Sequence, residues 1–160
     1  MKKLIKNLKL RIENIILCIR FPFLRPHNRW TLKKTKKWFG SFTELDGMPD
    51  VWRNAFGIEM CKELKRQLKK EHYLHKYIIM DVKEKYGELR WYDNGASEEI
   101  HNIVGKYTRL STTICWKCGA NHTEYVSKGW VYFYCPDCIN KEYLENYMSI
   151  EEYFAPDEDE

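Results

Sequence analysis

The sequence has no hydrophobic run long enough to cross a membrane as a helix. Its longest apolar stretch near the start, residues 15–19, is far shorter than the roughly 20 residues that a span requires. No secretory signal is recognisable, because charged residues interrupt the apolar positions before residue 15 and no small-residue cleavage site follows: Lys6, Lys9, Arg11 and Glu13. We therefore expect reduced cysteines and a protein that acts in a cytoplasm.

Acidic residues are nearly missing from the first quarter of the chain, and basic residues are missing from its end. Residues 1–37 hold twelve Lys or Arg against one acid, Glu13, which gives +11. Residues 150–160 hold six acids and no base, and residues 38–149 are nearly neutral. This distribution indicates a basic arm and a solvated acidic tail on a neutral body. No internal repeat divides that body.

Four of the six cysteines form two pairs with the same short spacing. Each pair encloses two residues and sixteen residues separate the pairs, which are Cys115 with Cys118 and Cys135 with Cys138. Two such turns offer four thiolates to one ion, and the spacing is typical of a structural Zn²⁺ site with Zn–S bonds of about 2.3 Å. Because four sulfurs leave no position for substrate or water, we expect the zinc to build structure and not to catalyse.

Other uses for the paired cysteines stay open at this point. Two disulfides would suit a secreted protein, and an iron–sulfur cluster also takes four thiolates. Cys18 and Cys61 have no partner in the pattern, so we interpret them as packing residues.

An amphipathic helix is predicted at the start of the chain, within a basic segment 1–26. Apolar residues recur there at steps of three and four: Leu4, Ile5, Leu8, Ile12, Ile15, Ile16 and Ile19. Such a basic helix can cover its own domain or another copy, dock on a partner or nucleic acid, or contact a membrane surface through residues 2–20. All three remain open.

Residues 27–44 are interpreted as a basic linker. Four lysines lie close together in it, flanked by Trp30 and Trp38: Lys33, Lys34, Lys36 and Lys37. Lysines and indoles in this arrangement can follow a phosphate backbone and stack on bases. A solvated loop whose tryptophans pack inward is the alternative.

A small α+β domain is predicted at 45–112, with Asp50 as the N-cap of its first helix. Its expected parts are a helix at 51–71, a hairpin at 76–92 that turns at Gly87, and a helix from an N-cap at Ser97 to about residue 111.

A zinc module at 113–148 should follow as a knuckle, a hairpin and a helix at 136–148, which is the order of a treble clef. Residues 149–160 form the acidic tail. The predicted fold class is thus α+β, a helix–hairpin–helix domain fused to a treble-clef-like four-cysteine module.

The hairpin segment 83–92 concentrates cations and aromatic side chains. Lys83, Lys85 and Arg90 can contact phosphate or acidic groups, and Tyr86 and Trp91 can stack or anchor a partner. Cross-strand ion pairs and aromatic contacts would explain the same residues by stability alone. Both readings are retained.

Several stretches together resemble a known group of proteins. Residues 52–57 (WRNAFG), Met60-Cys61, residues 83–95 (KEKYGELRWYDNG) and the two cysteine pairs are similar to small proteins of bacteriophages and prophages, to which no activity is assigned. The similarity covers about residues 45–140. It implies a phage-related origin, a zinc module and expression in the cytoplasm of a bacterial host.

We therefore expect a noncatalytic zinc protein that binds nucleic acid or a host nucleic-acid machine, with no small-molecule substrate. The first alternative is a protein–protein modulator, such as an inhibitor of a host enzyme or defence complex, or a minor particle component. The second is a metal-dependent nuclease, because Asp50 with Asp81 and Lys83 fits, by a short pattern, the two acids and the lysine of such enzymes.

Overall fold

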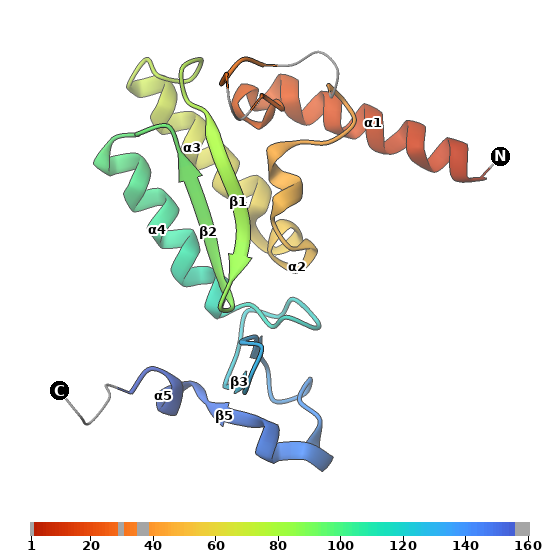
Figure 1. Ribbon diagram of the computed structural model, residues 1–160, viewed down its shortest axis with the longest axis vertical. Coiled ribbons are helices and arrows are strands. Elements are labelled where there is room, and N and C mark those ends of the chain that lie inside the picture. Colours follow the sequence, from red (N-terminus) through yellow and green to blue (C-terminus); the bar gives the residue numbers. More distant parts are fainter. Residues whose placement is uncertain (1, 29–30, 35–38, 156–160) are drawn as a thin grey trace.

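The computed structural model describes residues 2–28, 31–34 and 39–155, with side chains from residue 7 onward. It has an α+β fold in two parts, a larger domain of helices and one hairpin and a smaller module built on a three-stranded sheet (Figure 1). In chain order the helices and strands are α1 (Lys2–Arg20), η1 (Pro22–Leu24), η2 (Glu44–Gly47), α2 (Asp50–Trp52), η3 (Arg53–Gly57), α3 (Ile58–Lys70), β1 (Ile79–Lys85), β2 (Glu88–Asp93), α4 (Glu98–Thr112), β3 (Tyr125–Ser127), β4 (Phe133–Tyr134), η4 (Lys141–Asn146), β5 (Tyr147–Ser149) and α5 (Ile150–Tyr153).

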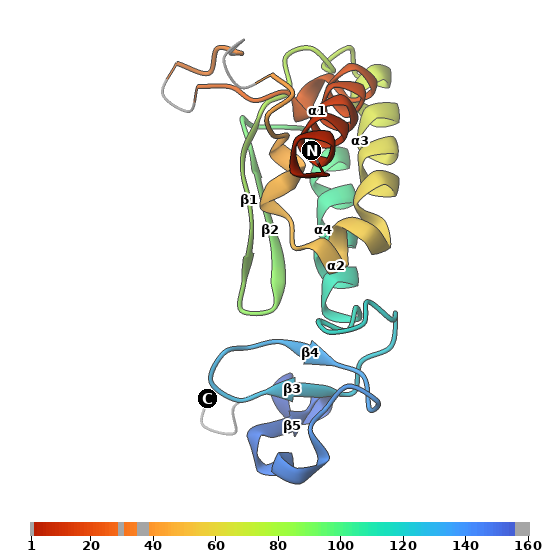
Figure 2. The same cartoon turned by 90° about the vertical axis from the view of Figure 1, so that its right-hand side faces the viewer.

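The core of the larger domain lies between the hairpin and the helices α3 and α4, which cover one of its faces (Figure 2). Side chains at steps of four along residues 52–68 enter this core, as the sequence predicts: Trp52, Phe56, Met60, Leu64 and Leu68. The helical run extends from residue 50 to 70 and passes Gly57 through a π-helical turn, η3, without a break. Asp50 is the first residue of this run and Pro49 holds the N-cap position, so the N-cap predicted at Asp50 is off by one residue.

The predicted hairpin is confirmed, and its turn has two residues. β1 and β2 pair antiparallel, with Val82 opposite Trp91 on the core face. Tyr86 and Gly87 form the turn with φ values of 55° and 73°. Two successive positive φ values match the turns that follow the right-handed twist of a hairpin, but they strain a residue with a Cβ. Tyr86 thus adopts a backbone conformation that tyrosine disfavours.

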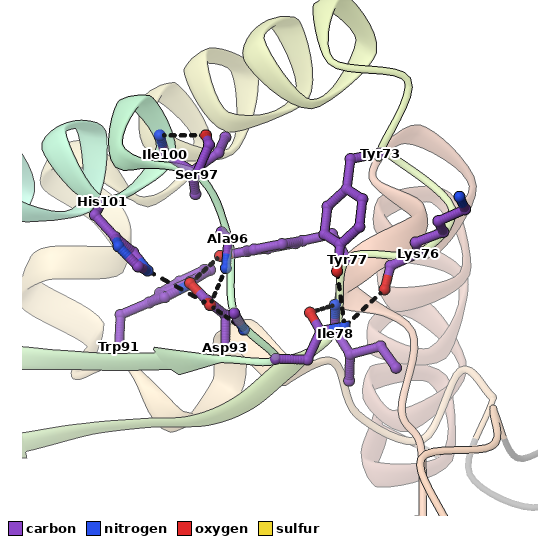
Figure 3. A network of polar contacts seen from close by, with 12 residues as sticks. Tyr73, Lys76, Tyr77, Ile78, Trp91, Asp93, Ala96, Ser97, Ile100 and His101 are labelled. Atoms are coloured by element: carbon purple, nitrogen blue, oxygen red, sulfur yellow. Dashed lines mark hydrogen bonds and ion pairs between the residues drawn. The ribbon is translucent and has the colours of Figure 1, made fainter.

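A polar network stabilises the other end of the hairpin (Figure 3). Trp91 Nε1 donates a hydrogen bond to the Tyr77 hydroxyl at 2.8 Å, and that hydroxyl donates to Asp93 at 3.2 Å. Asp93 also accepts from the backbone N–H groups of Gly95 and Ala96, both at 3.0 Å. Burial raises the pKa of the Tyr77 hydroxyl, so it remains a donor at neutral pH. These bonds connect β2 to α4, whose predicted N-cap is confirmed by the Ser97 hydroxyl accepting from Ile100 N–H.

The four-cysteine module, predicted as a zinc module, departs from the sequence prediction after its hairpin. β3 and β4 pair as expected, but the helix predicted at 136–148 is wrong. A short 3₁₀ segment, η4, occupies part of this range, and β5 then pairs antiparallel with the free edge of β3. The order β4-β3-β5 places β3 at the centre, so the treble clef is not confirmed. Tyr143 and Leu144, which lie on η4, are exposed.

The predicted linker begins and ends in buried residues. His27 Nδ1 lies 3.1 Å from Glu44 Oε1, and both side chains are almost fully buried. A β-bridge also joins His27 to Lys34. Because a buried carboxylate needs a partner, this pair anchors both ends of the segment to the domain. The first and last residues of the predicted linker, His27 and Glu44, therefore lie side by side in the domain.

The predicted acidic tail is folded in its first part. β5 ends at Ser149, and α5 follows directly. The rings of Tyr153 and Phe154 lie 5.8 and 6.1 Å from the ring of the buried Phe133. Apolar contacts thus hold this segment on the four-cysteine module despite its charge. Residues 156–160 of the predicted tail lie outside the described residues.

The helix predicted at residues 2–20 is confirmed as α1, which runs along one end of the larger domain and continues beyond it towards the N-terminus (Figure 1). Asn14 and Cys18 face the domain and are buried. No helix in the described part of the chain is long and apolar enough to cross a membrane.

Candidate metal centre and adjoining cleft

Two backbone turns bring the four paired cysteines together. In the first, the N–H of Gly119 donates to the carbonyl of Cys115 at 2.8 Å, and Gly119 takes the φ of +76° that favours glycine. In the second, the N–H of Cys138 donates to the carbonyl of Cys135 at 3.0 Å. β4 ends at Tyr134, directly before the second turn. The position of β4 in the sheet therefore places the second turn beside the first.

The geometry of the sulfurs fits one ion. All four sulfur atoms lie within 4.8 Å of one another, and those of Cys118 and Cys135 are 3.7 Å apart. A tetrahedron with Zn–S bonds of 2.3 Å has edges of about 3.8 Å. A disulfide would require about 2.0 Å, and a multi-iron cluster would hold its ligands farther apart around several metal atoms. The four cysteines therefore form a group that can hold a single metal ion.

The electrostatics of the site also favour a cation. Burial alone would raise the pKa of Cys115, but backbone N–H groups of Cys118, Cys135 and Lys117 outweigh it and lower that pKa to about 6. Burial and the neighbouring sulfurs raise the pKa of Cys138 to about 12. The pKa of Cys135 is also raised, mainly by burial. One thiolate thus forms readily and opposes the ionisation of the others. A divalent ion at their centre relieves this repulsion.

The first cysteine turn also connects the module to the larger domain. The side chain of Trp116, between the two cysteines of this turn, lies edge-on to Trp52 in the core with ring centroids 5.8 Å apart. On its other side it stacks on Tyr132 at 4.2 Å. A metal ion held by Cys115 and Cys118 would therefore fix the residue that docks the two parts.

A cleft of about 380 Å³ opens where the tip of the β1–β2 hairpin meets the β3–β4 loop. Figure 2 shows the hairpin tip directed at the module. Tyr86 of the hairpin and Trp130 of the loop both line this cleft, and these residues are 62% and 83% exposed. Lys85 also lines it, and its ammonium group lies 5.2 Å from the centre of the Tyr86 ring. Aromatic faces with a cation beside them suit flat, negatively charged ligands.

The outer face of the hairpin, away from the helices, carries cations. Lys83 and Arg90 lie directly opposite each other across the two strands. Like charges in this position destabilise a hairpin. Each is balanced by an acid on its own strand, Lys83 by Asp81 at 2.6 Å and Arg90 by Glu88 at 2.9 Å. Each of the two facing cations is thus paired with a neighbouring acid and remains partly exposed on this face.

The remaining predicted binding residues do not gather at one site. Trp91 is only 7% exposed and belongs to the core, so its predicted binding role is wrong, because its ring packs inward and its N–H bonds to Tyr77. Lys33 and Lys34 are exposed near His27, in a segment distant in the chain from the hairpin. Lys36 and Lys37 lie outside the described residues. The sequence analysis did not identify Trp130. Its position directly after Gly129, a residue typical of turns, is the signal that could have indicated an exposed loop.

The residues of the nuclease alternative do not form a metal cluster. Among the described residues, the four cysteines are the only group of three or more His, Cys, Asp or Glu side chains positioned to hold an ion. Asp81 is instead paired with Lys83, and Asp50 is exposed at the start of α2.

Comparison with models of protein families, with curated proteins and with solved structures finds no match to this chain.

Proposed function

We propose that the chain is a noncatalytic, zinc-stabilised protein that binds single-stranded nucleic acid, alone or as part of a host nucleic-acid machine. The observation that carries this proposal is that Tyr86 and Trp130, from two parts of the fold, line one cleft, with Lys85 of the hairpin beside the Tyr86 ring. Unpaired bases can stack on such rings whatever their sequence, and the cations attract the backbone. The resemblance to phage and prophage proteins adds a bacterial host as the setting.

The zinc has a positioning role in this proposal. Trp130 is on the β3–β4 loop, whereas Tyr86 is on the β1–β2 hairpin, so their spacing depends on how the module docks. Trp116 and the cysteine turn set that docking. Four thiolates around zinc leave no open position for a reacting group, which supports binding without catalysis.

Charge extends the site beyond the cleft. Lys83 and Arg90 lie on the outer face of the same hairpin that carries Tyr86, and Lys33 and Lys34 add to the basic character of residues 1–37. A bound strand that neutralises several of these cations releases counterions, so its affinity should fall as salt rises, by about 0.7 in log K per phosphate and per log unit of salt.

The direct test is fluorescence anisotropy with a labelled single-stranded oligonucleotide over a salt series. Trp130→Ala should weaken binding by roughly tenfold, because stacking contributes about 1–3 kcal/mol per base. Tyr143→Ala is the matched control, since Tyr143 is also an exposed aromatic but lies on η4 and does not line the cleft. Equal affinity of the wild type and Trp130→Ala would refute the proposal.

A protein partner is the second candidate, and the exposure of Trp130 favours it, because tryptophan is enriched among residues that dominate interfaces. This candidate predicts co-purification of one host complex that survives nuclease treatment and is lost in Trp130→Ala. A complex that disappears on nuclease treatment supports nucleic acid instead.

A further inference from the structure

One stripe of apolar side chains on α1 is left uncovered by the described part of the chain. Leu8, Ile12, Ile16 and Ile19 are each 50–69% exposed. They follow one another at steps of four, four and three, so they share one face of the helix. A continuous row of exposed leucine and isoleucine is costly in water and is typical of a surface that another phase or molecule covers.

A different face of α1 holds the helix on its own domain. Asn14 Nδ2 donates to the carbonyl of Ser41 at 3.4 Å, and the Cys18 thiol lies 3.8 Å from the carbonyl of Leu24. Ile15 packs against Gly40, where an added Cβ would come within 2.8 Å of its Cγ1. The predicted contact of this helix with its own domain is thus present, but it leaves the stripe uncovered by the described residues.

We propose that this stripe lies on an anionic lipid surface. Residues 1–20 carry six Lys or Arg and one acid, Glu13, for a net charge of +5. On the helix, Arg11 flanks the stripe on one side and Lys9 and Arg20 flank it on the other. Apolar side chains between two basic margins form the arrangement that enters the boundary between headgroups and acyl chains, while the cations contact the headgroups.

The first turn of α1 also favours contact with an anionic surface. Its first turn contains Lys2 and Lys3 and no acidic residue. Basic residues at the positive end of the helix dipole are unfavourable in water. Anionic headgroups offset this unfavourable charge, so the sequence of the first turn suits a negatively charged surface.

A second copy of the chain fits the stripe less well. Two helices paired through it would bring Lys9, Arg11 and Arg20 towards the same cations of the partner, and Glu13, 4.0 Å from Lys9, is the one acid in residues 1–20 to balance them. Ile15, which would complete the a and d positions of a heptad with Ile12 and Ile19, is already packed on Gly40. Both arguments favour lipid over a paired helix.

The test is cosedimentation of the full-length protein with vesicles of phosphatidylcholine alone or of equal parts phosphatidylcholine and phosphatidylglycerol. Wild type should bind the anionic vesicles and lose binding as salt rises. The double variant Ile12→Asp/Ile16→Asp should bind about tenfold more weakly or worse, because it places two charges where apolar contact is needed. Leu10→Asp is the control, since Leu10 is exposed on α1 but lies on the opposite side from the stripe.

Three outcomes would overturn the proposal: no binding to anionic vesicles, equal binding of the double variant and wild type, or equal loss in Leu10→Asp. A wild-type dimer by light scattering that the double variant converts to a monomer would assign the stripe to a second copy instead. Circular dichroism of each variant confirms that the fold is retained. The outcome is independent of the nucleic-acid proposal, because none of these residues lines the cleft.

Discussion

Gly87 lies against the ring of Phe133, and this contact joins the tip of the first hairpin to the four-cysteine module. A Cβ at Gly87 would be 2.6 Å from Phe133 Cε2 and 3.1 Å from the carbonyl oxygen of Val131. Since real Cβ atoms do not approach so closely, only glycine allows the two parts to touch here. The cleft between Tyr86 and Trp130 owes its shape to this close approach.

Gly87→Ala should therefore destabilise the protein by about 2–4 kcal/mol, from backbone strain at a φ of +73° together with the clash. Gly95→Ala is a matched control, because Gly95 has a φ of +89° and nothing within 4 Å of an added Cβ. It should show only the strain, about 1–2 kcal/mol. Chemical denaturation measures both, and equal losses would contradict the close contact.

Tyr77→Phe tests the polar network at the other end of the hairpin. Removal of the hydroxyl leaves Trp91 Nε1 without its acceptor in the core and should cost about 1–3 kcal/mol of unfolding free energy. Tyr92→Phe, on the exposed face of β2, should change stability by less than about 0.5 kcal/mol. A loss of similar size in both variants would mean that the network contributes nothing specific.

Exchange of Lys83 for glutamine distinguishes a role of the hairpin's outer face in binding from a role in stability. Lys83→Gln removes one of two facing cations, so stability should change by less than about 1 kcal/mol. Affinity for single-stranded nucleic acid should fall, and the salt slope should decrease by about 0.7. Lys62→Gln on α3 removes the same charge from another ion pair and should leave the slope unchanged. A common salt slope for wild type and both variants would exclude this face from the site.

Cys61 offers a test by pH. Burial raises the pKa of its thiol to about 12, whereas the unfolded value is 9.0. A raised folded pKa contributes stability that is complete below pH 9 and is lost as the pH rises from 9 towards 12, since the unfolded chain then releases the proton first. Between pH 9 and 11 the unfolding free energy of wild type should fall more steeply than that of Cys61→Ala, by up to about 1.4 kcal/mol per pH unit. Parallel curves would show that Cys61 is not buried as described.

Much of the larger domain could be predicted because its signals are local. The four-residue period from Trp52 to Leu68 determines a buried helical face, and the alternation around Gly87 indicates a hairpin. The π-turn at η3 could not be predicted, because Gly57 there gives the same signal as a helix break.

The error at 136–148 arose because tertiary pairing outweighed helical pattern. Asn140 does cap a helical start by accepting from Glu142 N–H, yet Tyr143 leaves the helical region with a φ of −131°. The following residues then pair with β3, with Met148 opposite Val126. An unpaired strand edge more than twenty residues away is not visible in the local sequence.

The four cysteines could be predicted as a metal site because their spacing along the chain is itself typical of such sites. The cleft could not be predicted in this way. Tyr86 was identified on its hairpin, but its place in one cleft with Trp130 depends on how two parts of the fold dock. Likewise, periodicity predicted an apolar face on α1, but it could not show that docking through Asn14 and Cys18 leaves that face uncovered.

The central claim is that one metal ion held by four thiolates organises the C-terminal part of the chain. Native mass spectrometry of the full-length protein, with alkylation before and after chelation, tests it most directly. We predict one zinc per chain and no alkylated cysteine in the folded protein, since Cys18 and Cys61 are buried, and four alkylated residues, Cys115, Cys118, Cys135 and Cys138, after chelation. Protein that contains no stoichiometric metal, or whose four cysteines are joined as two disulfides, would contradict the account.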